Sequence, residues 1–182
     1  MKRLVLVLVF LLLFAGVGYT DMVVNGGFET GDLTGWTQGG NTGFTFVSTD
    51  AHSGNHALSV GPVGSDGTLT QTLATAPGTR YDVNFWLKSD GSIPNDFGAS
   101  FGGINLLSLT NIPLQGYTDY NFQATITGAS SDLVFNFRND PGYLLLDDIS
   151  VNSVPEPSTL PLLGFGLAGL AVVKLMKKRV TA

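Results

Sequence analysis

The chain has 182 residues, no cysteine and two histidines. The absence of cysteine excludes disulfides, thiolate nucleophiles and Cys-ligated metal sites, and two histidines leave little material for acid–base relays near neutral pH. A net charge of −5 excludes nucleic acid as a partner, because such binding requires a basic surface. This length indicates one domain, or two at most.

The basic residues are concentrated at the two ends of the chain. Six of the nine lie there: Lys2, Arg3, Lys174, Lys177, Lys178 and Arg179. Between Met22 and Val154 only Arg80, Lys88 and Arg138 are basic, so the middle of the chain is acidic. Basic ends beside apolar runs have a different meaning from an acidic middle, and the sequence therefore divides into three parts.

Residues 1–20 have the pattern of a secretory signal peptide. Lys2 and Arg3 precede an apolar helix-forming run over residues 4–14, and the small residues Gly18 and Thr20 come just before a cleavage point at Asp21. The run is shorter than the roughly 20 residues that span a membrane. The alternative is an uncleaved N-terminal anchor. Both interpretations predict export.

Residues 154–182 have the pattern of a stiff linker, a membrane helix and a basic stop. Pro155 and Pro157 restrain the linker, and residues 160–173 are almost wholly apolar. With Lys174 reaching the headgroups, about 17 residues are available to span the bilayer. The basic end should stay cytoplasmic, which leaves the middle domain outside.

This tail resembles the PEP-CTERM sorting signal of bacterial surface proteins. The resemblance rests on the motif Val154, Pro155, Glu156, Pro157, followed by the apolar helix and the basic end. It implies that the chain is a substrate of exosortase, anchored in the inner membrane before processing and then placed in the cell envelope or extracellular matrix. Two departures are the early Lys174 and a Lys-rich end. A plain C-terminal anchor is the alternative.

Residues 21–153 show alternation of apolar and polar side chains rather than a helical period. The alternation covers residues 81–88, 120–126 and 133–138, and residues 144–151 form a final strand. Turn sequences separate these runs at 76–79 and 139–142, with Pro setting φ and Gly accepting positive φ. Many short strands between turns predict an all-β domain, a two-sheet jelly-roll sandwich.

The same segment resembles the carbohydrate-binding modules with a galactose-binding-like jelly-roll fold. The resemblance rests on runs at residues 25–29, 33–36, 51–58, 69–73, 77–87 and 146–151. It implies a two-sheet jelly roll and permits glycan binding.

That family commonly carries a structural calcium ion where the first and last strands meet. Glu29 and Asp147 match the positions concerned. Asp147 shares parity with Ile149 and Val151, so it is expected to point inward and to need a partner. A hard cation with backbone oxygens of residues 50–55 would supply one. The alternative is that backbone amides bind Asp147 and that solvent surrounds Glu29.

A sugar site needs an exposed aromatic ring and planar polar groups. Trp86 has outward parity on its strand. Four polar residues share that parity on their own strands, and if the strands are neighbours the five form one face: Asn84, Trp86, Lys88, Asn136 and Arg138. Alternatively, these are ordinary solvated positions, and Trp86 covers an edge or packs beneath a loop.

Enzyme motifs are weak. Residues 98–102 match G-x-S-x-G, but no helix is predicted after them and both histidines precede them. The sequence thus predicts a non-catalytic, exported protein associated with extracellular polysaccharide. A purely structural surface protein without a ligand is the alternative, and a small glycan-active enzyme is the least favoured.

Overall fold

The computed structural model describes residues 21–154, Gly166 and Gly169. The predicted signal peptide and nearly all of the predicted sorting signal, with its membrane helix, therefore lie outside the described residues. Within the described part, no helix is long and apolar enough to cross a membrane.

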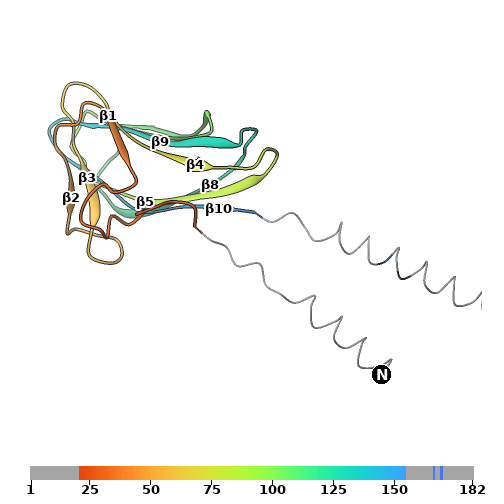
Figure 1. The fold of residues 1–182 in the computed structure, drawn as a ribbon. Coiled ribbons are helices and arrows are strands. Elements are labelled where there is room, and N and C mark those ends of the chain that lie inside the picture. Colours follow the sequence, from red (N-terminus) through yellow and green to blue (C-terminus); the bar gives the residue numbers. More distant parts are fainter. Residues whose placement is uncertain (1–20, 155–165, 167–168, 170–182) are drawn as a thin grey trace, which may run out of the picture.

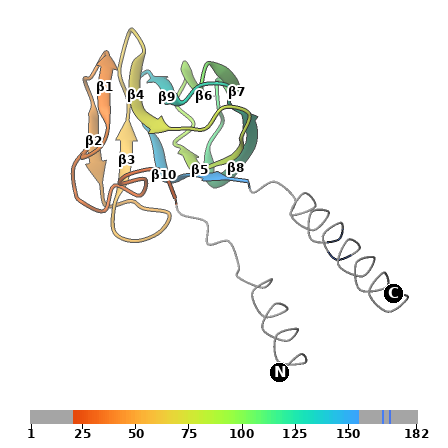
Figure 2. The same cartoon turned by 45° about the vertical axis from the view of Figure 1, so that its right-hand side comes forward.

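Ten strands form two antiparallel five-stranded sheets that face each other (Figures 1 and 2). The first sheet, called sheet A here, has the order β1 (Thr37–Gly40), β4 (Gly67–Ala74), β9 (Ser130–Asn139), β6 (Asn95–Phe101) and β7 (Ile104–Thr110). Sheet B has the order β2 (Thr45–Ser48), β3 (Ala57–Val60), β10 (Leu144–Ser153), β5 (Arg80–Ser89) and β8 (Gln115–Thr125). The predicted all-β, two-sheet jelly-roll fold is confirmed.

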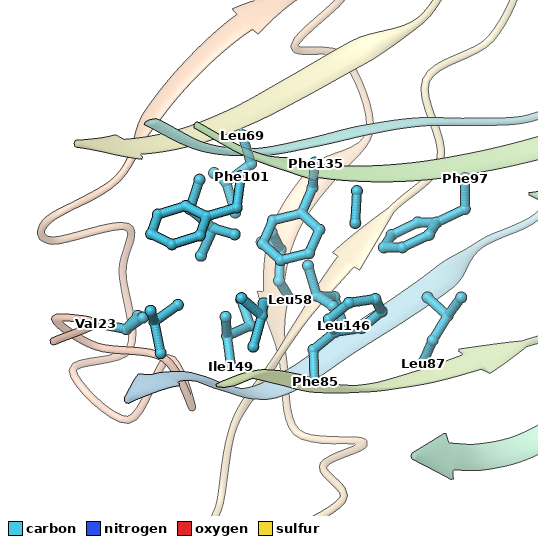
Figure 3. Close-up of a cluster of buried hydrophobic side chains, with 14 of the residues drawn as sticks. Val23, Leu58, Leu69, Phe85, Leu87, Phe97, Phe101, Phe135, Leu146 and Ile149 are labelled. Atoms are coloured by element: carbon cyan, nitrogen blue, oxygen red, sulfur yellow. The ribbon is translucent and has the colours of Figure 1, made fainter. Parts of the chain in front are cut away.

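The core lies between the sheets and is built from the inward members of the alternating runs (Figure 3). Phe85 of sheet B packs against Phe97 and Phe135 of sheet A, with ring centroids 5.7 Å and 5.2 Å away. Burial of each such ring contributes about 1.5 to 3 kcal/mol. Trp36 also belongs to the core, where its indole N–H donates to the carbonyl of Asn25 at 3.1 Å.

The two predicted turns form, but with different chemistry. Gly78 has a φ of +80°, as its turn requires. Gly142 is not among the residues with positive φ. A side chain at Gly142 would instead collide with Asp90 and Ser92. The close approach of the Asp90 and Ser92 side chains, and not a left-handed backbone, explains why this position is glycine.

The two ends of the described segment lie together. The Met22 amide donates to the Val151 carbonyl at 3.0 Å, and the Val151 amide donates to the Asp21 carboxylate at 3.0 Å. The Val154 amide donates to the Arg80 carbonyl at 2.8 Å. Five loops lie at the other end of the sandwich, where β10 begins. Backbone hydrogen bonds join two pairs of them, residues 41–44 with 61–66 and residues 90–94 with 140–143. This distal end comprises residues 41–44, 61–66, 90–94, 111–114 and 140–143.

Candidate functional site

Trp86 does not lie open on the outer face of sheet B. The segment of residues 49–56, called the covering loop here, passes over it. The imidazole ring of His52 stacks on the Trp86 ring at 3.7 Å between centroids, with the planes 13° apart. His52 also meets the Tyr117 ring edge-on at 5.5 Å. The structure thus matches the alternative in which Trp86 packs beneath a loop.

The other outward residues of β5 already have protein partners. Lys88 forms an ion pair with Asp50 at 2.5 Å, and the Tyr117 hydroxyl donates to the Asp50 carbonyl at 2.6 Å. Asn84 donates to Asp119 at 2.6 Å. Burial raises the pKa of Tyr117, and the nearby negative charges of Asp147, Asp50 and Asp148 add to this rise. The two Asp50 contacts fasten the covering loop to sheet B.

The predicted five-residue face does not exist as one surface. β5 belongs to sheet B and β9 to sheet A, so Asn136 and Arg138 lie on the opposite outer face from Trp86. Each residue was expected to point away from the core, and each is partly exposed. The condition that the strands be neighbours is not met, because alternation tells inside from outside but does not assign a strand to a sheet.

Asn136 and Arg138 lie on the outer face of sheet A among small side chains. The register places Thr68 on one side of Asn136 and Gly98 on the other. The row continues outward from Thr68 to Gly39 and from Gly98 to Ser108. A side chain at Gly98 would collide with the Asn136 amide, so that amide lies close over the Gly98 backbone.

Charged groups lie beside this row, two residues further along β9 and β6. Arg138 is opposite Asp96 in the register and forms an ion pair with Asp140. Burial raises the pKa of the Asp96 carboxyl, and the negative charge of Asp66 adds to this rise, while Arg138 opposes it. The surface around Asn136, Arg138, Asp96, Thr68 and Gly98 is called the sheet A face below. It offers an amide, a guanidinium group and a carboxyl group over a flat backbone.

Asp147 is fully buried, as predicted, but not within the core. It lies opposite Trp86 in the register, and an irregularity follows between Asp147 and Ser150. Asp148 has a φ of +47° there. This bulge shifts the alternation by one position, so Asp147 shares a face with Trp86 rather than with Ile149. The parity argument from the sequence was therefore wrong for Asp147.

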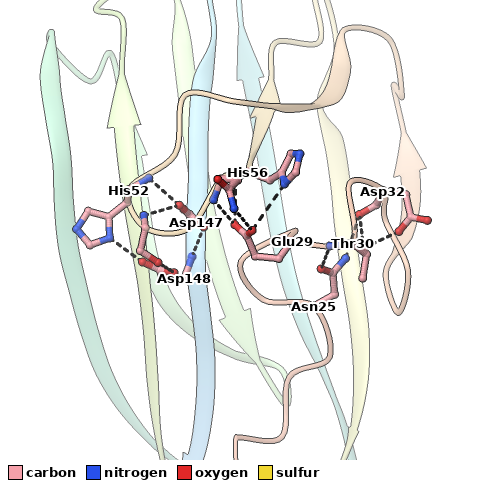
Figure 4. A network of polar contacts seen from close by, with 10 residues as sticks. Asn25, Glu29, Thr30, Asp32, His52, His56, Asp147 and Asp148 are labelled. Carbon is pink, nitrogen blue, oxygen red and sulfur yellow. Dashed lines mark hydrogen bonds and ion pairs between the residues drawn. The ribbon is translucent and has the colours of Figure 1, made fainter.

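Backbone amides of the covering loop bind the Asp147 carboxylate (Figure 4). His52 and Ser53 donate to Oδ2 at 2.7 Å and 3.2 Å, and Asp148 donates to Oδ1 at 2.7 Å. Burial still raises the pKa of Asp147, and the charge of Asp148 adds to this rise. The Asp148 carboxylate interacts with the same loop through His52 Nδ1 at 2.6 Å and the Ser53 hydroxyl at 2.7 Å.

Glu29 binds the end of the same loop. Its Oε1 accepts the amides of Asn55 at 2.8 Å and His56 at 2.9 Å, and these bonds lower the pKa of Glu29. Gly27 lies between the acidic groups, since a side chain there would be 3.6 Å from one oxygen each of Asp147 and Asp148. Oxygens of Asp147 and Asp148 thus face Gly27, and carboxylate oxygens are the donor type that a hard cation prefers.

Fewer side chains converge than a self-sufficient metal site needs. In the part of the chain that the structure describes, no group of three or more His, Cys, Asp or Glu residues is placed to hold a metal ion. A cation between Glu29 and Asp147 would therefore need backbone oxygens as well. No sequence signal pointed to His52 as the residue that covers Trp86, because the two are 34 positions apart and pair only in three dimensions.

Comparison with known proteins identifies the domain and the tail. A family model described as "Carbohydrate binding domain" matches residues 20–141, which is most of the folded body. The chain belongs to this family. A second model, described as "PEP-CTERM protein-sorting motif", matches residues 153–177. A search of curated proteins finds no match.

Solved structures of similar fold include several carbohydrate-binding domains. TmCBM61, solved with β-1,4-galactotriose, has 20% identity and a TM-score of 0.59, covering 74% of this chain and 99% of its own. The CBM22-1 xylan-binding domain of Paenibacillus barcinonensis Xyn10C has 18% identity and a TM-score of 0.55, covering 79% and 100%. The K3 cleaved adhesin domain of Lys-gingipain from Porphyromonas gingivalis has 17% identity and a TM-score of 0.55, covering 74% and 100%. At these identities the likeness shows the fold alone.

The carbohydrate-binding and sorting matches together indicate a surface protein that binds carbohydrate. The matched region belongs to a non-catalytic class of modules. The sorting motif indicates an exported protein associated with the cell envelope. No nucleic acid partner is indicated.

Proposed function

We propose that this protein is a substrate of exosortase that carries a non-catalytic domain to the cell envelope or extracellular matrix, where the domain binds extracellular polysaccharide. The observation that supports this most strongly is the order of the two family matches. The carbohydrate-binding match covers most of the folded body, and the sorting motif starts where β10 finishes. Before processing, the apolar segment predicted from the sequence to be a membrane helix would anchor the chain in the inner membrane.

The sheet A face is our proposed contact surface for the polysaccharide. Asn136 and Arg138 present planar groups that can donate to sugar hydroxyls, and the ion pair with Asp140 holds the guanidinium in place. The Asn136 amide covers the Gly98 backbone, and the small residues Thr68 and Ser108 lie on either side of this pair, so the surface stays low enough for a sugar chain to lie across the strands. The outward residues of β5 are less available for a sugar, because His52 covers Trp86 and because Lys88 and Asn84 already contact protein partners.

Retention on immobilised polysaccharides tests this proposal. We expect Asn136→Ala and Arg138→Lys each to weaken retention by roughly five-fold or more, the equivalent of one lost polar contact. Asn84→Ala is the matched control, because Asn84 is also an outward strand residue but lies on sheet B. Equal retention of all four proteins would remove the sheet A face from the proposal. Failure to bind any polysaccharide would favour the purely structural protein.

Processing at the sorting motif tests the second half of the proposal. We expect Glu156→Gln to change the apparent mass of the mature product, because a carboxylate between two rigid prolines is suited to a charge-assisted contact with the processing enzyme. Ser158→Ala is the control within the same linker. A product of normal size from Glu156→Gln would make the tail an ordinary anchor.

We also propose a calcium ion at Glu29 and Asp147. One carboxylate oxygen each of Asp147 and Asp148 lies beside Gly27, and the side chain of Glu29 lies next to them. When bound, the ion would neutralise part of this negative charge and tie the covering loop to β10. Hydrogen bonds from backbone amides to Asp147 and Glu29 can tie the covering loop to β10 without a metal ion. A chelator should therefore destabilise the domain if calcium is bound and have no effect if these hydrogen bonds act alone.

A further inference from the structure

Exposed large apolar side chains gather at the distal end of the sandwich. Among the described residues seven such side chains are exposed, and five of them belong to the distal loops or to the adjoining β2: Phe44, Phe46, Val63, Ile93 and Leu114. A surface of this kind has a free-energy cost in water, so its concentration at one end indicates a binding role.

Two aromatic rings in this region are held in a fixed arrangement. Phe46 of β2 and Tyr143, just before β10, meet edge to face with centroids 5.6 Å apart and planes at 76°. The Tyr143 ring lies so close to Gly61 that a side chain at Gly61 would collide with it. The Tyr143 amide donates to Asp90 at 2.7 Å. These contacts leave the pair with little freedom to lose on binding.

Phe44 extends the aromatic surface and has an unusual backbone. It is 61% exposed and has a φ of +56°, a conformation that bulky residues rarely adopt. Its carbonyl accepts the Gly61 amide at 3.0 Å, which joins it to the loop beside Tyr143. The positive φ of Phe44 has a free-energy cost, and burial of its exposed ring does not offset that cost. Uncompensated backbone strain of this kind is typical of functional sites, which indicates a functional use of the ring.

We propose that Phe46 and Tyr143 form a second carbohydrate-binding site, in which one ring of the pair stacks on the apolar C–H face of a sugar residue and the other ring borders that sugar. Phe44, two residues before Phe46, adds a further exposed ring at this end of the sandwich. This inference rests on the proposed polysaccharide binding and adds a site on another part of the domain. Asp90, which accepts the Tyr143 amide, and Ser92, which lies close to Gly142, provide polar groups near this end for the sugar's hydroxyl edge.

A sugar fits this surface better than a second copy of the chain. A stable protein interface buries about 800 Å² on each partner, and three rings cover only part of that area. The Phe46 and Tyr143 rings are also held rigidly edge to face, which suits the flat apolar face of a sugar. The site lies at the end of the sandwich remote from Val154, so it stays accessible while the sorting tail holds the chain.

Two sites on one domain predict avidity for long polysaccharides. Once one site holds a chain, the second binds at the high effective concentration set by the polymer. The distal aromatic site should therefore contribute more to the retention of a polymer than to the binding of a short oligosaccharide. The sheet A face and the distal site lie on separate surfaces, so variants can remove them one at a time.

The test uses the mature protein with β-1,4-galactan and xylan as probes, in retention and oligosaccharide titration experiments. We expect Phe46→Ala and Tyr143→Ala to weaken retention of the bound polymer roughly five-fold or more. Tyr143→Phe keeps the ring and should retain the polymer normally. Leu114→Ala, which removes the most exposed apolar side chain of the same end, should change nothing. If Phe46→Ala or Tyr143→Ala fails to fold, Phe46→Ser takes its place and should weaken retention by the same amount.

The outcomes separate the two proposals. If Asn136→Ala weakens retention and Phe46→Ala does not, the distal site is refuted and the proposed function stands. If neither probe is retained by the unchanged protein, the proposed function fails for these polysaccharides together with the distal site. Equal losses from Leu114→Ala and Phe46→Ala would indicate general stickiness and would refute stacking. Self-association that Phe46→Ala abolishes would make a second copy the occupant.

Discussion

The buried side chain of Asn95 offers a sharp test of how the distal loops are held. Asn95 is 3% exposed and acts like an extra piece of backbone between two loops. Its amide nitrogen donates to the carbonyls of Ser92 at 2.6 Å and Ile112 at 2.9 Å, and its oxygen accepts the Ile112 amide at 2.7 Å. Asn95→Ala removes all three bonds at once.

The expected loss follows from these bonds. Each buried hydrogen bond contributes about 1 kcal/mol to the free energy of unfolding. A buried backbone group that is left without a hydrogen-bond partner costs about 1 to 3 kcal/mol more. The free energy of unfolding should therefore fall by about 3 to 5 kcal/mol. At about 4 °C for each kcal/mol in a domain of this size, the melting temperature should fall by roughly 10 to 20 °C.

Urea unfolding followed by tryptophan fluorescence measures this loss. The control is Asn105→Ala, an exposed asparagine on β7, which should change stability by less than about 0.5 kcal/mol. A loss below about 1 kcal/mol for Asn95→Ala, with an unchanged denaturant slope, would refute the reasoning. It would mean that water replaces the Asn95 bonds at little cost.

Three further predictions concern the covering loop and the acid response. Trp86→Ala should lower stability by about 2 kcal/mol in urea unfolding, because it removes the stack with His52, while polysaccharide retention stays unchanged; selective loss of retention would contradict this. If calcium binds between Glu29 and Asp147, EDTA lowers the melting temperature and added calcium restores it, and an identical melting curve would exclude the ion. Hydrogen bonds lower the pKa of Asp90 although burial opposes them. Its contribution is therefore present above its ordinary value of 3.8 and lost as pH falls through the lower folded value, so the stability difference from Asp90→Asn should shrink below about pH 4.

The sequence predicted the long strands well and the candidate site only in part. Alternation identified β5, β8 and β9, because a strand with one buried face repeats every two residues, and residues 144–151 were expected as the final strand that became β10. The same rule failed at Asp147, where the bulge at Asp148 adds a residue and reverses the parity. It also could not reveal that His52 covers Trp86, since a contact across 34 positions leaves no local pattern.

The chain by itself determined the β class, the inward or outward side of each regular strand, and the pattern of its two terminal segments, because these properties depend on residues close together in sequence. Only the tertiary structure decided which outward residues share a surface. Asn84 and Asn136 have equivalent patterns, yet pairing with distant strands places them in different sheets. The same long-range pairing brings Phe46 beside Tyr143 from almost a hundred positions away. Strand pairing depends on the complementarity of the whole domain, and a local stretch of sequence cannot contain that information.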